Sequence, residues 1–144
     1  MKELTTIIEE LCLEIEEFHE HGVYLPISAD NVEYFLVKQA KVANLAFDLT
    51  HHYYNITRES TQILGSYKVK MAIRQKELLN SKDVNNKPYS AVKAKIEAEV
   101  EYKDIESSGK LLESEADAIK LYVTMASNIR QTLNQFVSTI NKSF

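Results

Sequence analysis

The sequence predicts an all-α fold, a long antiparallel helical hairpin of the coiled-coil type with an additional N-terminal amphipathic helix. Its 144 residues include three glycines and two prolines, too few turn-forming residues for a β-rich fold of this size. Residues 30–79 contain no proline and a single glycine. Their apolar residues recur in alternating steps of four and three, the spacing of a helix that packs along a seam.

Residues 1–22 form the first predicted helix, which is acidic. Its apolar face carries Leu4, Ile8, Leu11, Ile15 and Phe18, and glutamates cover the other faces. Next to this face stands the single cysteine, Cys12, which excludes an internal disulfide and which we expect to be a buried small hydrophobe.

Residues 30–79 form the long helix, which begins with a capping-box-like pair, Asp30 and Glu33. Before residue 47 it is apolar around much of its circumference, so we expect both the first helix and the C-terminal helix to cover it. Farther along, one seam remains. The seam residues of this helix are Leu49, Tyr53, Ile56 and Ile63.

Residues 80–90 are polar and rich in turn-forming residues, which predicts a hairpin loop. A return helix follows at residues 90–141, interrupted at most near residues 107–110, where two serines precede Gly109. Two helices of similar length joined by a short loop fold back on each other, and residues 1–144 make one helical domain. The seam residues of the return helix are Leu112, Ile119, Ile129, Leu133, Phe136 and Ile140. Both sets of seam residues are candidates for the core and for the contacts of a homo-oligomer.

Charge is distributed unevenly along the chain, whose formal net charge is -4. Residues 66–95 hold eight basic and two acidic residues, so this segment carries +6 and the remainder carries -10. Single-stranded nucleic-acid sites combine such cations with aromatic rings that stack on bases. The candidate nucleic-acid-binding residues are Lys68, Lys70, Arg74 and Lys76, with Lys93 and Lys95 facing them from the return helix and Tyr67 as a stacking platform. The alternative is a solvated basic face, or one that pairs with acidic residues elsewhere.

Other chemistry has little support in the sequence. Glu16 with His19, and Asp48 with His51, have the spacing of di-iron ligand pairs, but apolar neighbours occupy the inward positions, so we expect no metal and no cofactor. No phosphate-binding loop, nucleophile elbow or paired-cysteine motif occurs, which argues against an enzyme. No apolar run is long enough to span a membrane and the chain does not begin like a signal peptide, so we expect a cytoplasmic protein.

Three local features carry a resemblance to a known family. They are the run Lys-Val-Lys-Met-Ala-Ile-Arg before the loop, Lys-Pro-Tyr in the loop, and the long tyrosine-bearing return helix. Over about residues 65–140 the chain resembles the UvsY recombination mediators of T-even-like phages, although its acidic N-terminal helix and the apolar segment after it are longer. The resemblance implies a small helical phage protein of the host cytoplasm that self-assembles into rings. It also implies binding of single-stranded DNA through basic residues at positions such as Lys68 and Arg74, and help in loading a RecA-like recombinase against the single-strand binding protein.

Two functional hypotheses follow. In the first, the protein is a non-enzymatic single-stranded DNA-binding accessory protein of recombination or replication, with several subunits aligning their basic ends. In the second, it is a structural or regulatory helical module, such as an assembly scaffold or an inhibitor, that binds a protein partner and no nucleic acid. The sequence favours them about equally.

Overall fold

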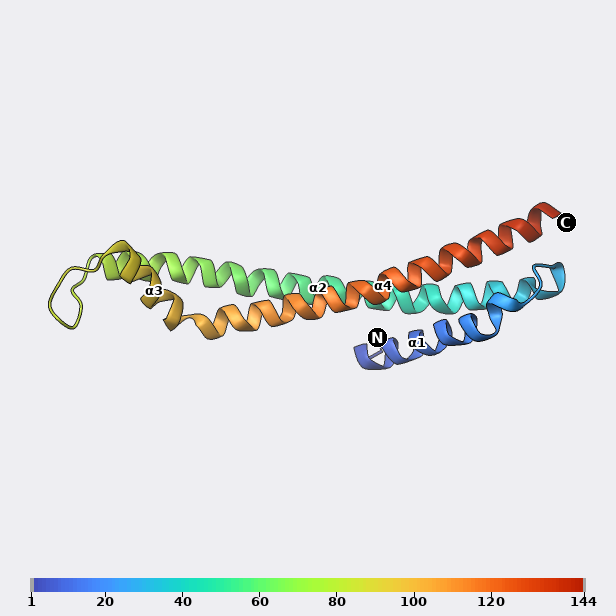
Figure 1. The fold of residues 1–144 in the computed structure, drawn as a ribbon, viewed down its shortest axis with the longest axis horizontal. Helices are drawn as coiled ribbons and strands as arrows, with labels where there is room; N and C mark the ends of the chain where they lie inside the picture. Colours follow the sequence, from blue (N-terminus) through green and yellow to red (C-terminus); the bar gives the residue numbers. More distant parts are fainter. Residues whose placement is uncertain (1, 144) are drawn as a thin grey trace. The chain divides into compact units, whose positions relative to one another are not determined.

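The computed structural model describes residues 2–143, and the predicted all-α fold is confirmed. Its helices are α1 (Leu4–Glu20), α2 (Val32–Leu79), α3 (Ala91–Glu101) and α4 (Lys103–Ser143), with short 3-10 helices at Gly22–Tyr24 and Ala29–Asn31 (Figure 1). Residues 2–143 form no β-strand. The domain predicted over residues 1–144 divides into two compact units. Unit 1 comprises Met1–Tyr54 with Asp117–Phe144, and unit 2 comprises Asn55–Ala116.

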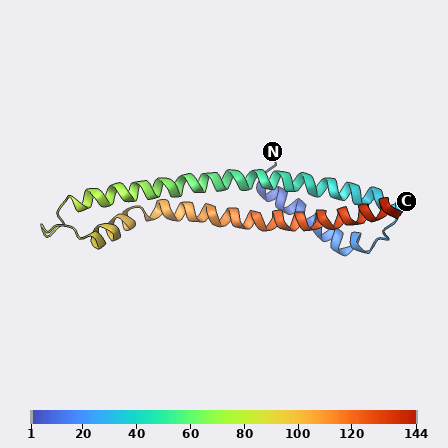
Figure 2. The same cartoon turned by 90° about the horizontal axis from the view of Figure 1, so that it is seen from above.

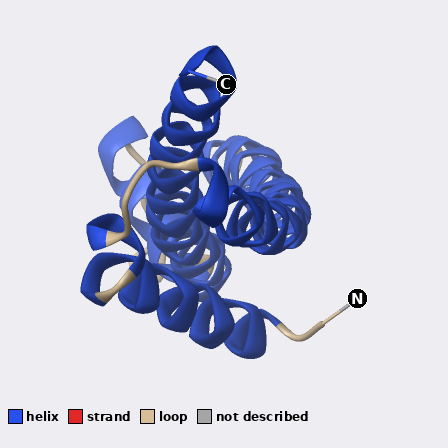
Figure 3. Cartoon of the chain, turned by 90° about the vertical axis from the view of Figure 1, so that its right-hand side faces the viewer, coloured by secondary structure: helices blue, strands red, loops and turns tan. Residues whose placement is uncertain are grey.

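Unit 1 contains α1, the first half of α2 and the C-terminal part of α4. The two segments from α2 and α4 run antiparallel, and α1 lies beside them (Figures 1 and 3). Three aromatic residues join the helices, because the Phe136 ring of α4 lies 5.3 Å from Phe35 of α2 and 6.2 Å from Phe18 of α1. Both expected neighbours of the apolar part of α2 are therefore present.

A buried lysine fastens α1 to α2. The Lys38 side chain is 6% exposed, and its ammonium lies 2.5 Å from a Glu14 carboxylate oxygen and 2.6 Å from one of Glu17. Tyr34 donates a hydrogen bond of 2.6 Å to Glu17. Burial opposes the ionisation of Glu17, but the hydrogen bonds from Lys38 and Tyr34 outweigh it, so the pKa of Glu17 is lowered. The stabilisation that ionised Glu17 provides is complete at pH values above the usual carboxyl pKa and is lost as the pH falls through the lowered pKa of Glu17.

Unit 2 contains the second half of α2, the loop after it, α3 and the first turns of α4, which return along α2 (Figure 2). At one end Leu78 packs with Ala94 and Ala98 of α3. Near the other, the buried Ser60 hydroxyl donates to the Gly109 carbonyl across 2.9 Å. Small residues on the returning segment thus let the two helices approach closely.

The ten predicted seam residues are all at least partly buried. Five are buried and five are partly exposed. The buried ones are Leu49, Ile119, Ile129, Leu133 and Ile140, and the partly exposed ones are Tyr53, Ile56, Ile63, Leu112 and Phe136. The five buried residues belong to the core, while a role of any of the ten between subunits stays a prediction.

Several local predictions differ from the structure. The helix is continuous through residues 107–110 and is interrupted instead at Tyr102, whose ψ of 15° departs from helical geometry. Gly109 predicted a break in the return helix. In the structure, its lack of a side chain instead lets α4 pack closely against Leu64 and Ile63 of α2. Asp30 lies within a 3-10 helix that precedes α2, so it is not the cap of that helix. Cys12 is exposed rather than buried, because it follows Leu11 by one residue and so lies off the stripe of buried residues on α1.

Replacing Lys38 with methionine should weaken the attachment of α1. The Lys38→Met variant leaves Glu14 and Glu17 without their shared cation, and since these carboxylates are 24% and 40% exposed we expect a loss of only about 1–3 kcal/mol. Hydrogen exchange of the α1 amides should accelerate. The matched control is Lys41→Met, which removes a 59% exposed lysine that lies 3.9 Å from Glu14. Equal effects of the two substitutions would contradict the role assigned to Lys38.

The two helical glycines of unit 2 should respond oppositely to alanine. A Cβ at Gly65 meets nothing within 4 Å, so Gly65→Ala should stabilise the protein by about 0.5–1 kcal/mol through backbone entropy. A Cβ at Gly109 would lie 2.7 Å from Cγ of Leu64, so Gly109→Ala should destabilise it by about 1 kcal/mol despite the better helix propensity. In thermal unfolding, the Tm should rise for Gly65→Ala and fall for Gly109→Ala. A rise in Tm for both variants would refute the close packing at Gly109.

Candidate nucleic-acid interface

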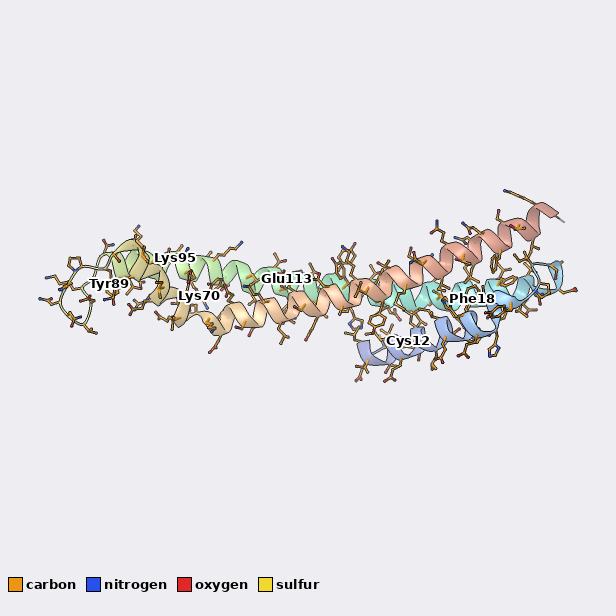
Figure 4. All side chains as sticks on the ribbon, in the orientation of Figure 1. Cys12, Phe18, Lys70, Tyr89, Lys95 and Glu113 are labelled. Atoms are coloured by element: carbon orange, nitrogen blue, oxygen red, sulfur yellow. The ribbon has the colours of Figure 1, made fainter. Side chains whose placement is uncertain are left out.

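The basic residues predicted from the sequence all lie in unit 2, on the second half of α2 and on α3. Figure 4 labels two of them, Lys70 on α2 and Lys95 on α3. Lys68, Lys70 and Lys76 are exposed on α2, and none of them forms an ion pair with another described residue. On α3, Lys95 lies 4.0 Å from Glu99, a loose contact between exposed side chains. Four lysines therefore keep most of their charge accessible to a partner.

The three free lysines of α2 do not share a face. Successive residues of an α-helix turn by about 100°, so Lys68 and Lys70 lie on nearly opposite flanks and Lys76 points away from the buried side that includes Leu78. Charge is thus distributed around the helix. This arrangement suits a flexible polyanion that can follow the surface better than a rigid duplex that must meet one flat strip.

Arg74 and Lys93 are both held in ion pairs within unit 2. The Arg74 guanidinium contacts Glu101 at 2.8 Å and Glu77 at 3.2 Å. Hydrogen bonds to Glu101 and then Glu77 are the main cause of its raised pKa. Lys93 contacts Asp83 at 2.6 Å. Because each cation already has a carboxylate partner, they contribute less free charge than the sequence suggested.

The two tyrosines near the lysines are also engaged. Tyr67 is partly buried, and desolvation followed by its hydrogen bond to Glu106 raises its pKa. Tyr89 packs against the buried cluster of Leu78, and the Lys93 ammonium lies 5.3 Å from its ring centre. These rings stabilise unit 2, so neither is a fully open stacking platform.

Asp83 orders the loop between α2 and α3, a role that sequence reasoning missed. One of its carboxylate oxygens accepts hydrogen bonds from the backbone amides of Asn85 at 2.9 Å and Lys87 at 3.0 Å, while the other meets Lys93. Asn86 takes a positive φ of 59°, a conformation that asparagine tolerates. The signal in the sequence was the run Asp-Val-Asn-Asn, which is typical of an Asx turn. The fixed loop displays two further exposed lysines, Lys82 and Lys87, for which no ion pair occurs among the described residues.

The acidic residues of the returning segment balance the basic stretch of α2. Unit 2 as a whole contains 11 basic and 10 acidic residues, a formal net charge of +1. The acidic residues between 97 and 106 belong to α3 and the start of α4, which fold back beside α2. The +6 of residues 66–95 is therefore a local excess at the loop end of the unit, largely cancelled over the unit as a whole.

Within residues 2–143 no group of three or more histidine, cysteine, aspartate or glutamate side chains is placed to hold a metal ion. No helix in the same range is both long and apolar enough to cross a membrane. Comparisons with protein-family models, with curated proteins and with solved structures find no match to this chain. Function must therefore be argued from the residues themselves.

Removing the Asp83 carboxylate should loosen the loop. In Asp83→Ala the amides of Asn85 and Lys87 lose their acceptor, so we expect faster hydrogen exchange at both. In the wild type, the bond to Lys93 is the main cause of the lowered pKa of Asp83, so loop order should be complete above the usual aspartate range and decline as the pH falls through the lowered value. A control, Glu113→Ala, removes an exposed carboxylate elsewhere in unit 2 (Figure 4). Unchanged exchange in Asp83→Ala would refute this account of the loop.

Proposed function

We propose that this protein is a non-enzymatic accessory protein that binds single-stranded DNA through the loop end of unit 2. The observation that carries the proposal is a group of exposed lysines without carboxylate partners. They are Lys68, Lys70 and Lys76 on α2 together with Lys82 and Lys87 in the loop. Paired cations such as Arg74 hold the unit together and leave these lysines free to meet phosphates.

Unpaired lysines favour a polyanion for a physical reason. Each phosphate that a lysine neutralises releases a condensed counterion, so several modest contacts add up to useful affinity at low salt. A single strand bends easily and can reach cations on different sides of one helix, as Lys68 and Lys70 require. One copy offers few contacts, so binding becomes strong only if several copies act on one strand.

The resemblance to UvsY mediators gives this proposal its biological setting. On that basis the protein is a homo-oligomeric recombination or replication mediator of a phage, active in the host cytoplasm, with a RecA-like recombinase and a single-strand binding protein as partners. The support is the basic run that contains Lys68, Lys70 and Arg74, which lies on α2 directly before the loop.

Binding of a fluorescent single-stranded oligonucleotide, followed by anisotropy across a salt series, tests the proposal. In Lys68→Ala/Lys70→Ala/Lys76→Ala, affinity should fall for every oligonucleotide sequence. The slope of log affinity against log salt should become shallower by about 2, because each phosphate that a lysine neutralises adds about 0.7 to the slope. The substituted side chains are exposed and unpaired, so the helical circular dichroism should not change.

A matched control is Lys120→Ala/Lys142→Ala, which removes two exposed lysines of unit 1. It should leave binding nearly unchanged. The proposal fails if the wild-type protein does not bind at low salt, or if the control variant weakens binding as much as the triple variant.

A second candidate is the helical protein-interaction module without nucleic-acid binding. The observation that favours it is the number of large apolar side chains left exposed, among them Phe47 at 74%, Leu121 at 68% and Val100 at 71%. Together with the near-neutral charge of unit 2, these side chains favour a protein partner. Absence of DNA binding in the salt series would favour this candidate.

A further inference from the structure

The first half of α2 carries a second four-three seam, shifted by about one residue from the buried one. We call it the open seam. It consists of Leu36, Ala40, Ala43, Phe47, Thr50 and Tyr54, all of which belong to unit 1. Because residues three and four apart share a helix face, these six side chains form one continuous stripe. Since α2 already buries one seam of heptad spacing, a second seam of the same spacing predicts a second packing partner.

No described part of unit 1 covers the open seam. Phe47 is 74% exposed, Tyr54 65% and Leu36 47%. On α2, the residues that bind α1, such as Lys38, lie on roughly the opposite side, and those that face α4, such as Phe35, lie on the flank between. The helices of the unit therefore occupy two sides of α2 and leave the third open.

A groove runs beside the open seam between α2 and α4. Its volume is about 380 Å³. The residues that line it are Ala43, Ala46, Phe47 and Thr50 of α2 and Val123, Ser127 and Arg130 of α4. The large, exposed Phe47 ring thus lies beside a hollow whose α2 wall also includes the small residues Ala43 and Ala46. Surfaces that present a projection beside a hollow can pair with a copy of themselves.

The spacing of the open seam is the same in both directions. Its steps are four, three, four, three and four, so an antiparallel copy of α2 with a two-fold axis level with Leu45 brings the seam into register with itself. In that register Phe47 of each copy faces Ala43 of the other, at the groove. Thr50 then faces Ala40, and Tyr54 faces Leu36. Large side chains meet small ones at the centre, and two large ones meet at each end.

Charge and area both permit this pairing. No charged residue belongs to the open seam, and among the residues that line the groove Arg130 alone is charged, so the face carries little like charge against its own copy. The seam spans about 27 Å of helix, and α2 and α4 side by side are about 20 Å wide, which gives a face of about 500 Å² per copy and about 1,000 Å² in total. That is the lower limit for a specific interface, which suits a dimer with a dissociation constant on the order of micromolar.

We propose that the open seam binds a second copy of this chain in an antiparallel two-fold dimer, with Phe47 inserted against Ala43 of the partner copy. The proposal stands on unit 1 alone and does not depend on DNA binding, whose candidate residues lie in unit 2. A dimer that forms but binds no DNA would therefore overturn the proposed function alone, whereas loss of the dimer would also weaken DNA binding.

Sedimentation analysis of the full chain from about 1 to about 100 μM tests the dimer. Phe47→Glu should raise the dissociation constant at least tenfold, because it places a charge at the centre of an apolar interface. The matched control is Leu121→Glu, the same kind of change at a 68% exposed residue of unit 1 outside the open seam. It should leave the dimer intact. Both positions are exposed, so circular dichroism should show the same helix content.

A pair of size changes tests the register. Ala43→Phe alone sets two large rings opposite each other and should weaken the dimer, whereas Ala43→Phe/Phe47→Ala exchanges projection and hollow and should restore it. A wild-type protein that stays monomeric at about 100 μM overturns the proposal. So does a dimer that Phe47→Glu leaves unchanged, or one that the exchange variant fails to restore while its helix content and Tm match the wild type.

Discussion

The structure depends on one constraint, the need of a 48-residue helix to bury apolar residues along its length. In unit 1, α2 meets that need with α4 on one side and α1 on another. The contact with α1 includes a lysine that is almost fully buried, which is stable only because Glu14 and Glu17 both lie within hydrogen-bond distance of its ammonium. With these two partners in place, α2 still has the open seam, because its apolar residues extend around more of the helix than two neighbours can cover.

The charge balance of unit 2 depends on which segment folds back beside the second half of α2. The second half of α2 is basic, and the segment that folds back beside it is acidic, so part of the basic charge becomes structural. Arg74 bonded to Glu101 illustrates this internal use, and Lys93 bonded to Asp83 fixes the loop. What remains for a partner is a set of lysines concentrated near the loop. Their number is modest, which explains why the proposed DNA binding depends on several copies acting together.

Much of the fold was predictable because the period of apolar residues reports burial directly. Leu49, Ile119 and Leu133 were assigned to a seam and are buried. The interruption at Tyr102 was not predictable, since neither glycine nor proline marks it. Gly109 was read as a helix breaker, and its actual role, close contact with Leu64, involves a residue 45 positions away in sequence.

The candidate site was predicted less completely, because pairing depends on where the chain returns. A count that ends at residue 95 includes Glu77 but stops before Glu101, the nearer of the two carboxylates that pair with Arg74. Lys68, Lys70 and Lys76 were proposed as phosphate-binding residues, and the structure leaves them exposed and without an ion pair among the described residues, while their role in binding stays a prediction. Lys38 was overlooked, because its two carboxylate partners belong to another helix.

The distance between spin labels in the dimer tests the central claim, that α2 has a second seam which pairs with its own copy. Labels would be attached through Asn44→Cys or Glu33→Cys, both exposed positions, in a Cys12→Ser background. An axis level with Leu45 predicts a distance of about 20 Å between labels at position 44. At position 33 it predicts about 40 Å, since those sites are 24 helical residues apart along the axis at about 1.5 Å each. Equal distances at the two positions, or no coupling between chains, would contradict the account.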